Sequence, residues 1–209
     1  MKVVSVIPES FQEFEDHISV VMFFFGCNFK CSYCYNYDVV TNIKNILPDS
    51  PETILDRCMS PLIDGCVLLG GEPTIYGNRL FELANYAKKE YNLDVKLFTN
   101  GSNPEIVIDG LMRGLFDRVS IDFKFFNSHD FIDFKCSGLT HENYVDSIIN
   151  LLTRIRELNL QSFVEVRTTQ EASVSDKEIE IIKNICNNFQ IPHIMQVEVS
   201  DSYKRLGVL

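Results

Sequence analysis

The sequence predicts an α/β fold in which a parallel sheet carries helices on its outside, in the form of an incomplete (β/α)6 barrel. Two observations predict it: short apolar or β-branched runs recur six times along the 209 residues, and amphipathic helical patterns lie between them. Strands that alternate with helices pair in parallel through right-handed crossovers. Six such units form either an open doubly wound sheet or an incomplete barrel, since a complete eight-unit barrel requires roughly 250 residues.

The predicted strands are short, and most of them lack a clean alternation of apolar and polar residues. That pattern is typical of strands covered on both faces, as in a parallel sheet. The strands span residues 18–25, 65–70, 94–98, 118–123, 162–168 and 193–199.

Helical patterns separate these strands, over residues 50–58, 78–91, 103–113, 141–158 and 175–189. Ser50 and Ser175 are placed to cap two of the helices, and Pro51 suits a first helical turn. Apolar residues recur at helical spacing in three groups: Leu80, Leu83, Ala84 and Ala87; Tyr144, Ile148, Leu151, Ile155 and Leu158; Ile179, Ile182 and Cys186. No repeat or linker interrupts the pattern, so we expect one domain over residues 1–209.

The composition, 45% hydrophobic and 23% charged, is that of a globular protein with one sizeable core. Acidic residues are spread along the chain and give a net charge of −10, so a nucleic-acid surface, which needs a basic stripe, is not expected. No apolar run is long enough to span a bilayer, and the N-terminus lacks the pattern of a signal peptide. We therefore expect a cytoplasmic protein without a membrane partner.

The chain contains seven cysteines, an odd number that argues against a disulfide framework in a protein without a secretion signal. Cys27, Cys31 and Cys34 cluster directly after the first predicted strand. Their spacing, three and then two intervening residues, suits a loop wrapped around a compact object. The other four are scattered and are expected to be small apolar core residues: Cys58, Cys66, Cys136 and Cys186.

Three clustered thiols in a reducing compartment indicate either a metal site or redox chemistry. A structural zinc site usually has four protein ligands and a catalytic one has three with a water, and no fourth Cys or His lies near in the sequence. Iron–sulfur clusters normally take one thiolate per iron, so three thiolates on a four-iron cluster leave one iron open to an outside ligand. The spacing alone leaves both kinds of metal open.

Polar and glycine residues recur where the predicted strands end. In parallel α/β folds, ligands bind at the carboxyl ends of the strands, so we expect these residues to surround one site. The residues are Gly70, Gly71, Glu72, Pro73, Thr74, Thr99, Asn100, Gly101, Ser120, Asp122, Lys124, Arg167, Thr168, Thr169 and Gln196.

The motif Cys27-Asn-Phe-Lys-Cys31-Ser-Tyr-Cys34, followed by Gly70-Gly71-Glu72-Pro73, resembles the radical S-adenosylmethionine (SAM) superfamily. The order of the motifs and their placement after strands match as well, and the resemblance covers essentially the whole chain. It implies one 4Fe–4S cluster held by the three cysteines, with SAM chelating the open iron through its amino and carboxylate groups. An electron from the reduced cluster would then cleave a C–S bond of SAM and give a 5′-deoxyadenosyl radical that abstracts a hydrogen atom.

The resemblance also implies roles for the residues that follow the second strand. Glu72 and the backbone of Gly70 and Gly71 would hold the amino group of SAM, since glycine lets a backbone approach a ligand closely. Tyr33 would stack on the adenine. The alternative for the glycine motif is an ordinary strand-to-helix turn, and Tyr33 could instead cover the core.

At the later strands, Asp122 and Lys124 match an Asp-x-Lys motif near the SAM carboxylate, and Arg167 would be a second cation there. The alternatives are a surface ion pair for the first two and a salt bridge from Arg167 to Glu165. The other strand-end residues assigned to cofactor binding are Pro73, Thr99, Asn100, Ser120 and Gln196.

Within the superfamily, "CSYCYN", "LFTNG", "SIDFK" and "EVRTT" resemble the small activating enzymes of glycyl-radical enzymes. The nearest are the longer form of the anaerobic ribonucleoside-triphosphate reductase activase and the pyruvate formate-lyase activase. This implies an oxidoreductase that uses an external electron donor, such as flavodoxin or ferredoxin, to install a glycyl radical on a partner enzyme. Phe98 departs from that branch, where an Asp at this place helps to bind a cation beside SAM.

Other functions stay open. Short members of the superfamily include 7-carboxy-7-deazaguanine synthase, which acts on a small heterocycle with Mg²⁺, and enzymes that modify peptides. A non-enzymatic alternative is a metal-binding module that docks a partner. Glu72 with its two glycines favours the enzyme, because a purely structural metal site does not need them.

Overall fold

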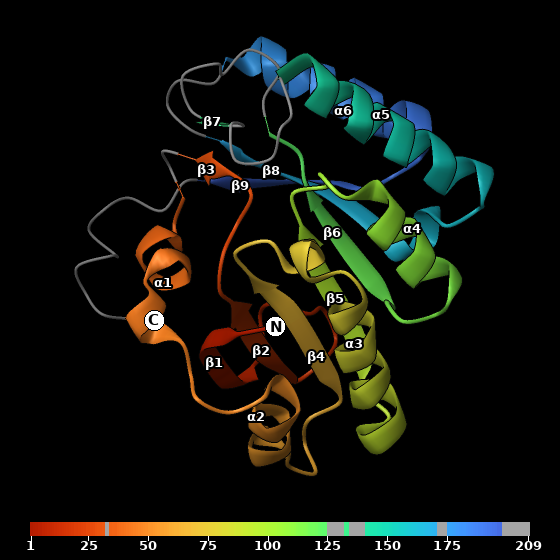
Figure 1. Ribbon diagram of the computed structural model, residues 1–209. Helices are drawn as coiled ribbons and strands as arrows, with labels where there is room; N and C mark the ends of the chain where they lie inside the picture. The colour runs from red at the N-terminus through yellow and green to blue at the C-terminus, as the bar shows by residue number, and fades with distance from the viewer. Residues whose placement is uncertain (32–33, 125–131, 134–140, 171–174, 198–209) are drawn as a thin grey trace.

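A computed structural model of the protein describes residues 1–31, 34–124, 132–133, 141–170 and 175–197 (Figure 1). A seven-stranded sheet runs through it in the order β1-β2-β4-β5-β6-β8-β9, and every neighbouring pair from β2 to β9 is parallel. The strands are β1 (Val3–Ser10), β2 (Ser19–Phe24), β4 (Gly65–Gly70), β5 (Asp94–Thr99), β6 (Arg118–Asp122), β8 (Val164–Gln170) and β9 (His193–Val197). The predicted α/β fold with a parallel sheet and outer helices is confirmed, and all six predicted strands are present.

The remaining strand, β1, was not predicted. It pairs antiparallel with β2 at the edge of the sheet. Its sequence contains Pro8, which cannot donate a ladder hydrogen bond and is therefore tolerated in an edge strand. The strand was missed because it does not belong to the alternation of strand and helix on which the prediction relied.

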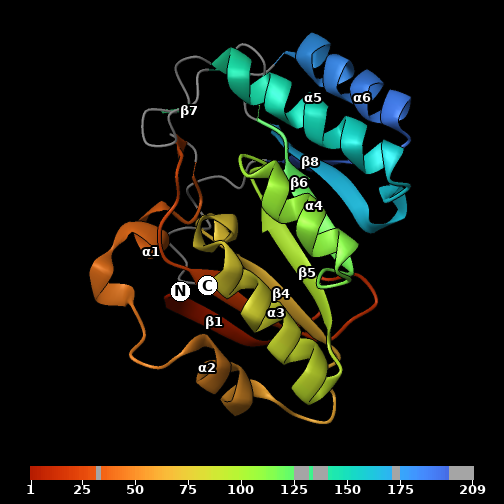
Figure 2. The ribbon, with the colours of Figure 1, turned by 45° about the vertical axis from the view of Figure 1, so that its right-hand side comes forward.

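The principal helices are α2 (Pro51–Cys58), α3 (Asn78–Tyr91), α4 (Pro104–Met112), α5 (His141–Glu157) and α6 (Asp176–Phe189). Figures 1 and 2 show them following one another around the outside of the sheet, from α2 to α6. Short elements add to these: α1 (Tyr37–Thr41), η1 (Ile43–Asn45), η2 (Pro73–Tyr76), η4 (Gln161–Phe163), and a two-stranded pair of β3 (Lys30–Cys31) with β7 (Ile132–Asp133). None of the short elements was predicted, because each has too few residues to show a period.

Both predicted caps are present. Ser50 accepts a hydrogen bond from the backbone N–H of Thr53, and Pro51 begins α2. Ser175 caps α6 in a capping box, in which the Glu178 side chain accepts from the Ser175 N–H in return. These local signals explain why the two helix starts could be predicted to the residue.

The main core lies between the helices and the sheet. The predicted apolar stripes of α3 and α5 face it: Leu80, Leu83, Ala84, Ala87, Tyr144, Ile148, Leu151 and Ile155 are all fully buried. Leu158 was assigned wrongly to the stripe of α5, since it lies beyond the end of the helix and is 40% exposed. Cys66 and Cys186 are buried in this core and Cys58 packs partly against it, as expected, whereas Cys136 lies outside the described residues.

The opposite face of the sheet carries a smaller apolar cluster of Phe14, Val21, Val67 and Leu69. Beside it lies Lys96, a fully buried cation whose Nζ is 2.8 Å from Oε2 of Glu15 and 3.3 Å from Oε1 of Glu165. These two carboxylates, Glu165 buried and Glu15 exposed, compensate for the loss of water around the ammonium group. In the described part of the chain, no helix combines the length and the apolar character that crossing a membrane requires.

Candidate cofactor site at the carboxyl ends of the strands

The cysteine loop, defined here as the described residues 25–31 and 34–36, follows β2. Its thiols Cys27, Cys31 and Cys34 form no disulfide within the described residues, and all three are half-buried. Burial raises the pKa of Cys27 to about 12, and the nearby Glu72 and the other two thiols add to this shift. Burial also raises the pKa of Cys31, with Cys34 contributing. The three thiols are therefore close enough to influence one another, and binding of a metal would release their protons.

The donor set consists of three thiols, which as thiolates are the ligands that iron–sulfur clusters take. Over the residues with described positions, no three His, Cys, Asp or Glu side chains are grouped so that they could hold one ion. A zinc ion requires its ligands to converge within 2.0–2.3 Å of one point, whereas a four-iron cluster takes each thiolate on a different iron. Three soft donors spread along one loop match the second requirement.

The glycine motif packs against the start of the cysteine loop. A Cβ on Gly70, which has a φ of +117°, would lie 2.3 Å from the Phe24 nitrogen, and a Cβ on Gly71 would lie 1.8 Å from the Gly26 oxygen. Backbone hydrogen bonds of 2.9 Å run from Gly71 N to Phe24 O and from Glu72 N to Gly26 O. In the structure these glycines thus allow close approach of the cysteine loop, whatever contact they also make with a ligand.

Gly71→Ala is expected to lower the free energy of unfolding of the metal-free chain by at least about 3 kcal/mol, because its methyl group would overlap a backbone oxygen that cannot move alone. In a domain of this size the midpoint of thermal unfolding should fall by roughly 6–12 °C. Gly114→Ala is the control: its Cβ would meet no atom within 4 Å, and only the left-handed backbone at φ +63° would cost about 1 kcal/mol. Equal losses in the two variants would contradict the packing argument.

Glu72 links the ends of β4 and β5. Its side chain is 1% exposed. Oε1 accepts hydrogen bonds from Thr74 N at 3.1 Å, Thr74 Oγ1 at 2.5 Å and Thr99 Oγ1 at 2.7 Å, and Oε2 accepts from Asn100 N at 2.7 Å. Burial raises the pKa of the Glu72 carboxyl, although the hydrogen bonds that it accepts act in the opposite direction. The sequence suggested a ligand for SAM here, and missed that four donors of the chain itself already surround the carboxylate.

Asn100 continues the connection into the cysteine loop. Its Nδ2 donates to Oδ1 of Asn28 at 2.9 Å, and Nδ2 of Asn28 donates to Oγ of Ser102 at 2.8 Å. Asn103 donates from Nδ2 to Oγ1 of Thr74 at 2.8 Å, and this hydroxyl in turn donates to the Glu72 carboxylate. Asn28, Ser102 and Asn103 were not predicted, although Asn28 stands inside the cysteine motif.

Tyr144 of α5 contacts the site from the side of the sheet that the helices cover. Its buried hydroxyl lies 3.1 Å from the carbonyl oxygen of Asn100 and 3.2 Å from that of Asp122, and accepts a hydrogen bond from Lys124 N. Its ring meets the edge of Phe29, with centroids 5.4 Å apart. The helical spacing of apolar residues predicted correctly that Tyr144 lies in the core, but that spacing could not predict the contacts of the hydroxyl.

Asp122 and Lys124 form an ion pair next to the cysteine loop. Both influence Cys31: the cation lowers the pKa of the thiol and the carboxylate raises it. Oδ1 of Asp122 is buried and has no hydrogen-bond partner within the described ranges. The two residues therefore lie at the cysteine loop, and among the described residues one carboxylate oxygen of the pair is left without a donor.

The side chains of Arg167 and Ser120 both contact Glu165 instead of the cysteine loop. Arg167 Nε is 3.4 Å from Oε1 of Glu165, and its guanidinium group lies 4.8 Å from the centroid of the Phe98 ring. Ser120 donates to the same carboxylate oxygen at 2.5 Å. The salt bridge that the sequence left as an alternative for Arg167 is thus present, and Phe98 contacts both this cation and Lys96.

The structure places the remaining predicted residues as follows. Pro73 is buried at the start of η2, and Thr99 is buried at the end of β5, where its hydroxyl also accepts from Gly101 N. Gln196 is exposed on β9, opposite Thr169. Tyr33 lies outside the described residues. The cysteine loop, the glycine motif, the end of β5 and the Asp122–Lys124 pair come together, whereas Ser120 and Gln196 do not join them.

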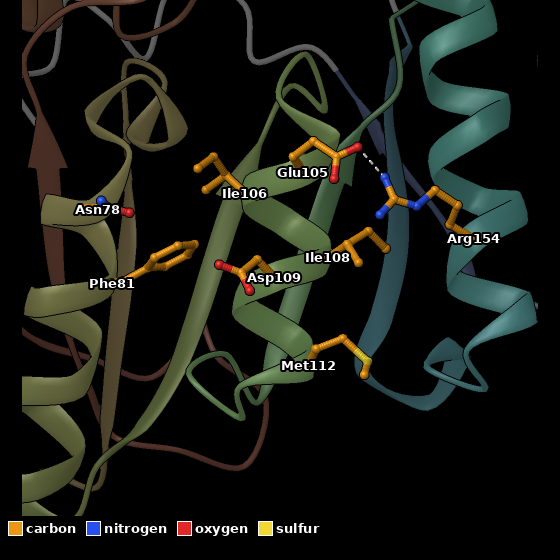
Figure 3. Close-up of a pocket in the computed structure, with 8 residues that line it drawn as sticks. All are labelled: Asn78, Phe81, Glu105, Ile106, Ile108, Asp109, Met112 and Arg154. Carbon is orange, nitrogen blue, oxygen red and sulfur yellow. Dashed lines mark hydrogen bonds and ion pairs between the residues drawn. The ribbon is translucent and has the colours of Figure 1, made fainter.

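A groove of about 380 Å³ lies on the helical surface between α3 and α4 (Figure 3). An ion pair between Arg154 of α5 and Glu105 of α4 borders it. None of its lining residues belongs to the predicted site: Asn78, Phe81, Glu105, Ile106, Ile108, Asp109, Met112 and Arg154.

Comparison with known proteins agrees with the motifs. The sequence profile of the radical SAM superfamily matches residues 21–169, more than half of the chain. A protein of Methanocaldococcus jannaschii named "putative glycyl-radical enzyme activating enzyme" is 33% identical over 201 residues, which are 95% of this chain and 80% of that protein.

Two further relatives match over less of their length. The S-adenosylmethionine-dependent nucleotide dehydratase of a Fibrobacter species is 27% identical over 68% of this chain and 44% of its own. The 7-carboxy-7-deazaguanine synthase of Methanothermobacter thermautotrophicus is 31% identical over 66% of this chain and 53% of its own. The chain thus spans about half the length of these two proteins. The extent of the superfamily match and the meeting of its two motifs at one edge of the sheet show that the chain belongs to the radical SAM superfamily.

Proposed function

We propose that the chain binds one 4Fe–4S cluster and SAM at the cysteine loop and uses them to install a glycyl radical on a partner enzyme. The observation that carries the proposal is the contact between the cysteine loop and the glycine motif. In this contact the N–H of Glu72 donates a hydrogen bond of 2.9 Å to the carbonyl oxygen of Gly26. Two motifs separated by more than 30 residues in the chain are thereby part of one site. Membership of the superfamily supports the use of both cofactors.

Cys27, Cys31 and Cys34 would hold three irons of the cluster and leave the fourth for the amino and carboxylate groups of SAM. When bound, the reduced cluster supplies one electron that cleaves SAM to methionine and a 5′-deoxyadenosyl radical, which takes a hydrogen atom from the substrate. The chain's own part is to place these groups and to shield them. The packing of Phe29 on Tyr144 buries the middle of the motif and limits the access of water.

Lys124 is the cation best placed to meet the carboxylate of SAM, because it lies beside the cysteine loop and influences Cys31. Asp122 pairs with it, and its buried Oδ1, which accepts no hydrogen bond from the residues that the structure describes, could accept one from a donor such as the amino group of SAM. Arg167 would reach the site only by leaving its salt bridge with Glu165, so we assign it a lesser part.

The activase function rests on the similarity to the M. jannaschii protein over 95% of this chain. Since only three of the cysteines lie together within the described residues, we propose one cluster and an external electron donor such as flavodoxin or ferredoxin. The partner would be a glycyl-radical enzyme of the anaerobic ribonucleotide reductase type.

The test is anaerobic incubation of the cluster-loaded chain with SAM, a reductant and each candidate glycyl-radical enzyme, followed by electron paramagnetic resonance (EPR). A glycyl doublet in the partner, matched by one 5′-deoxyadenosine released per radical formed, is the expected result. Formation of 5′-deoxyadenosine without a glycyl signal on any partner would keep the radical chemistry and reject the activase function. Cys27→Ala is the negative control for both signals.

A second candidate is a synthase that acts on a small heterocycle. The observation that favours it is the 31% identity to the deazaguanine synthase over 66% of this chain. Incubation of the loaded chain with that enzyme's substrate, SAM and Mg²⁺ decides between the two, since a heterocyclic product seen by mass spectrometry would replace the activase function.

A further inference from the structure

Asn28 stands directly after the first cysteine of the motif, and both ends of its side-chain amide are bonded. Oδ1 accepts from Nδ2 of Asn100 at 2.9 Å, and Nδ2 donates to Oγ of Ser102 at 2.8 Å. The backbone N–H of Ser102 in turn donates to Oδ1 of Asn100 at 2.9 Å, so the three residues form a closed set. An amide supplies both an acceptor and a donor, and these two contacts use one of each.

This set is tied to the buried carboxylate of Glu72. The N–H of Asn100 donates to Oε2 of Glu72 at 2.7 Å, while the N–H of Glu72 donates to the carbonyl oxygen of Gly26 at 2.9 Å. The segment from Gly26 to Asn28 is therefore held at both of its ends by groups that meet at one residue. Cys27 lies in the middle of that segment.

We propose that Asn28 is a positioning residue that orders the cysteine loop around Cys27 before any cofactor is bound. The Cys27 side chain contributes little to this ordering, since the hydrogen bond that its sulfur accepts from Phe29 N is a weak one at 3.4 Å. Ordering a loop in advance removes part of the entropy cost that would otherwise oppose binding. The consequence for the cluster rests on the proposed function, whereas the ordering of the loop does not.

Hydrogen exchange of the metal-free chain, measured by mass spectrometry on peptides that cover residues 25–31, tests the ordering. Asn28→Ala removes both hydrogen bonds and should speed exchange in this segment about tenfold, with β4 unaffected. Ser102→Ala removes one of the two bonds and should speed it about threefold. Asn184→Ala, on the exposed side of α6, is the matched control and should leave the segment unchanged.

The cluster-loaded chain supplies the second readout. Asn28→Ala should lose its cluster to an iron chelator several times faster than Asn184→Ala. Asn28→Asp should restore wild-type exchange and retention, because both carboxylate oxygens can accept from Asn100 and Ser102. Its added negative charge beside the cluster should at the same time lower the reduction potential, which a purely structural role would not require.

Unchanged exchange in residues 25–31 of Asn28→Ala, relative to Asn184→Ala, would overturn the proposal, as would equal rates of cluster loss. If Asn28→Ala unfolds as a whole, Ser102→Ala decides: a faster exchange confined to the segment supports the proposal, and an unchanged rate overturns it. If the wild-type chain takes up no cluster, the proposed function fails, and the exchange experiment alone then decides whether Asn28 orders the loop.

Discussion

Replacing Cys27, Cys31 or Cys34 with alanine, one at a time, is expected to abolish reductive cleavage of SAM while the chain stays folded. Each thiolate would hold a different iron, so the two that remain in a variant cannot replace the ligand that is missing. The three side chains are half-buried on one loop outside the main sheet, and Cys27 and Cys31 pack only against the margin of the core, so we expect the fold to persist without any one of them. Formation of 5′-deoxyadenosine should fall to the background level, and the iron content of the purified chain should fall with it.

Cys58→Ala is the matched control for these variants, since Cys58 is also a half-buried free thiol but lies at the end of α2. It should keep full iron content and activity. Circular dichroism of all variants checks that the fold persists. Retained 5′-deoxyadenosine formation in any of the three loop variants would remove that cysteine from the ligand set, and loss of iron in Cys58→Ala would show that the set is larger than proposed.

Glu72→Ala is expected to lower the free energy of unfolding of the metal-free chain by about 3 kcal/mol or more, because it leaves buried donors of three residues without an acceptor. Glu72→Gln is the sharper test. Its amide keeps one oxygen for the threonine donors but turns an N–H group toward the N–H of Asn100, at a cost of about 1–3 kcal/mol. The midpoint temperature of thermal unfolding should fall by roughly 2–12 °C in the glutamine variant.

The same measurements separate a structural Glu72 from one that only binds SAM. Glu180→Gln, on the exposed side of α6, is the control for the change of charge and should leave both stability and SAM affinity unchanged. If Glu72→Gln unfolds like the wild type while its affinity for SAM falls, Glu72 is a ligand and the hydrogen bonds around it contribute little. A loss of stability without SAM present supports the structural role.

The strands could be predicted because their signal is local. Runs such as 65–70 and 94–98 are buried on both faces and end at turn residues, and the resulting strands agree with them to within one residue. β1 could not be predicted, since its run contains Pro8 and no helix follows it before β2. Its place at the edge, next to β2, is decided by tertiary pairing.

The residues of the site likewise fall into those that a local sequence pattern predicts and those that it does not. The three cysteines lie within eight positions and the glycine motif is an unbroken run, so each could be recognised as a local pattern. The pairing of Asn28 with Asn100 spans 72 positions, and that of Tyr144 with Asn100 spans 44, so no local pattern announces either. Strand position predicted which residues lie near the carboxyl ends, but not that Ser120 would turn to Glu165 inside the sheet.

Spectroscopy of the reduced, cluster-loaded chain with isotopically labelled SAM tests whether three thiolates leave one iron open. We expect about four irons and four sulfides per chain, and a change in the EPR spectrum of the reduced cluster when SAM is added. Hyperfine coupling between the cluster and ¹⁵N in the amino group of SAM should accompany that change. A chain that binds one zinc ion instead, or a four-iron cluster whose spectrum and couplings ignore SAM, would contradict the assignment.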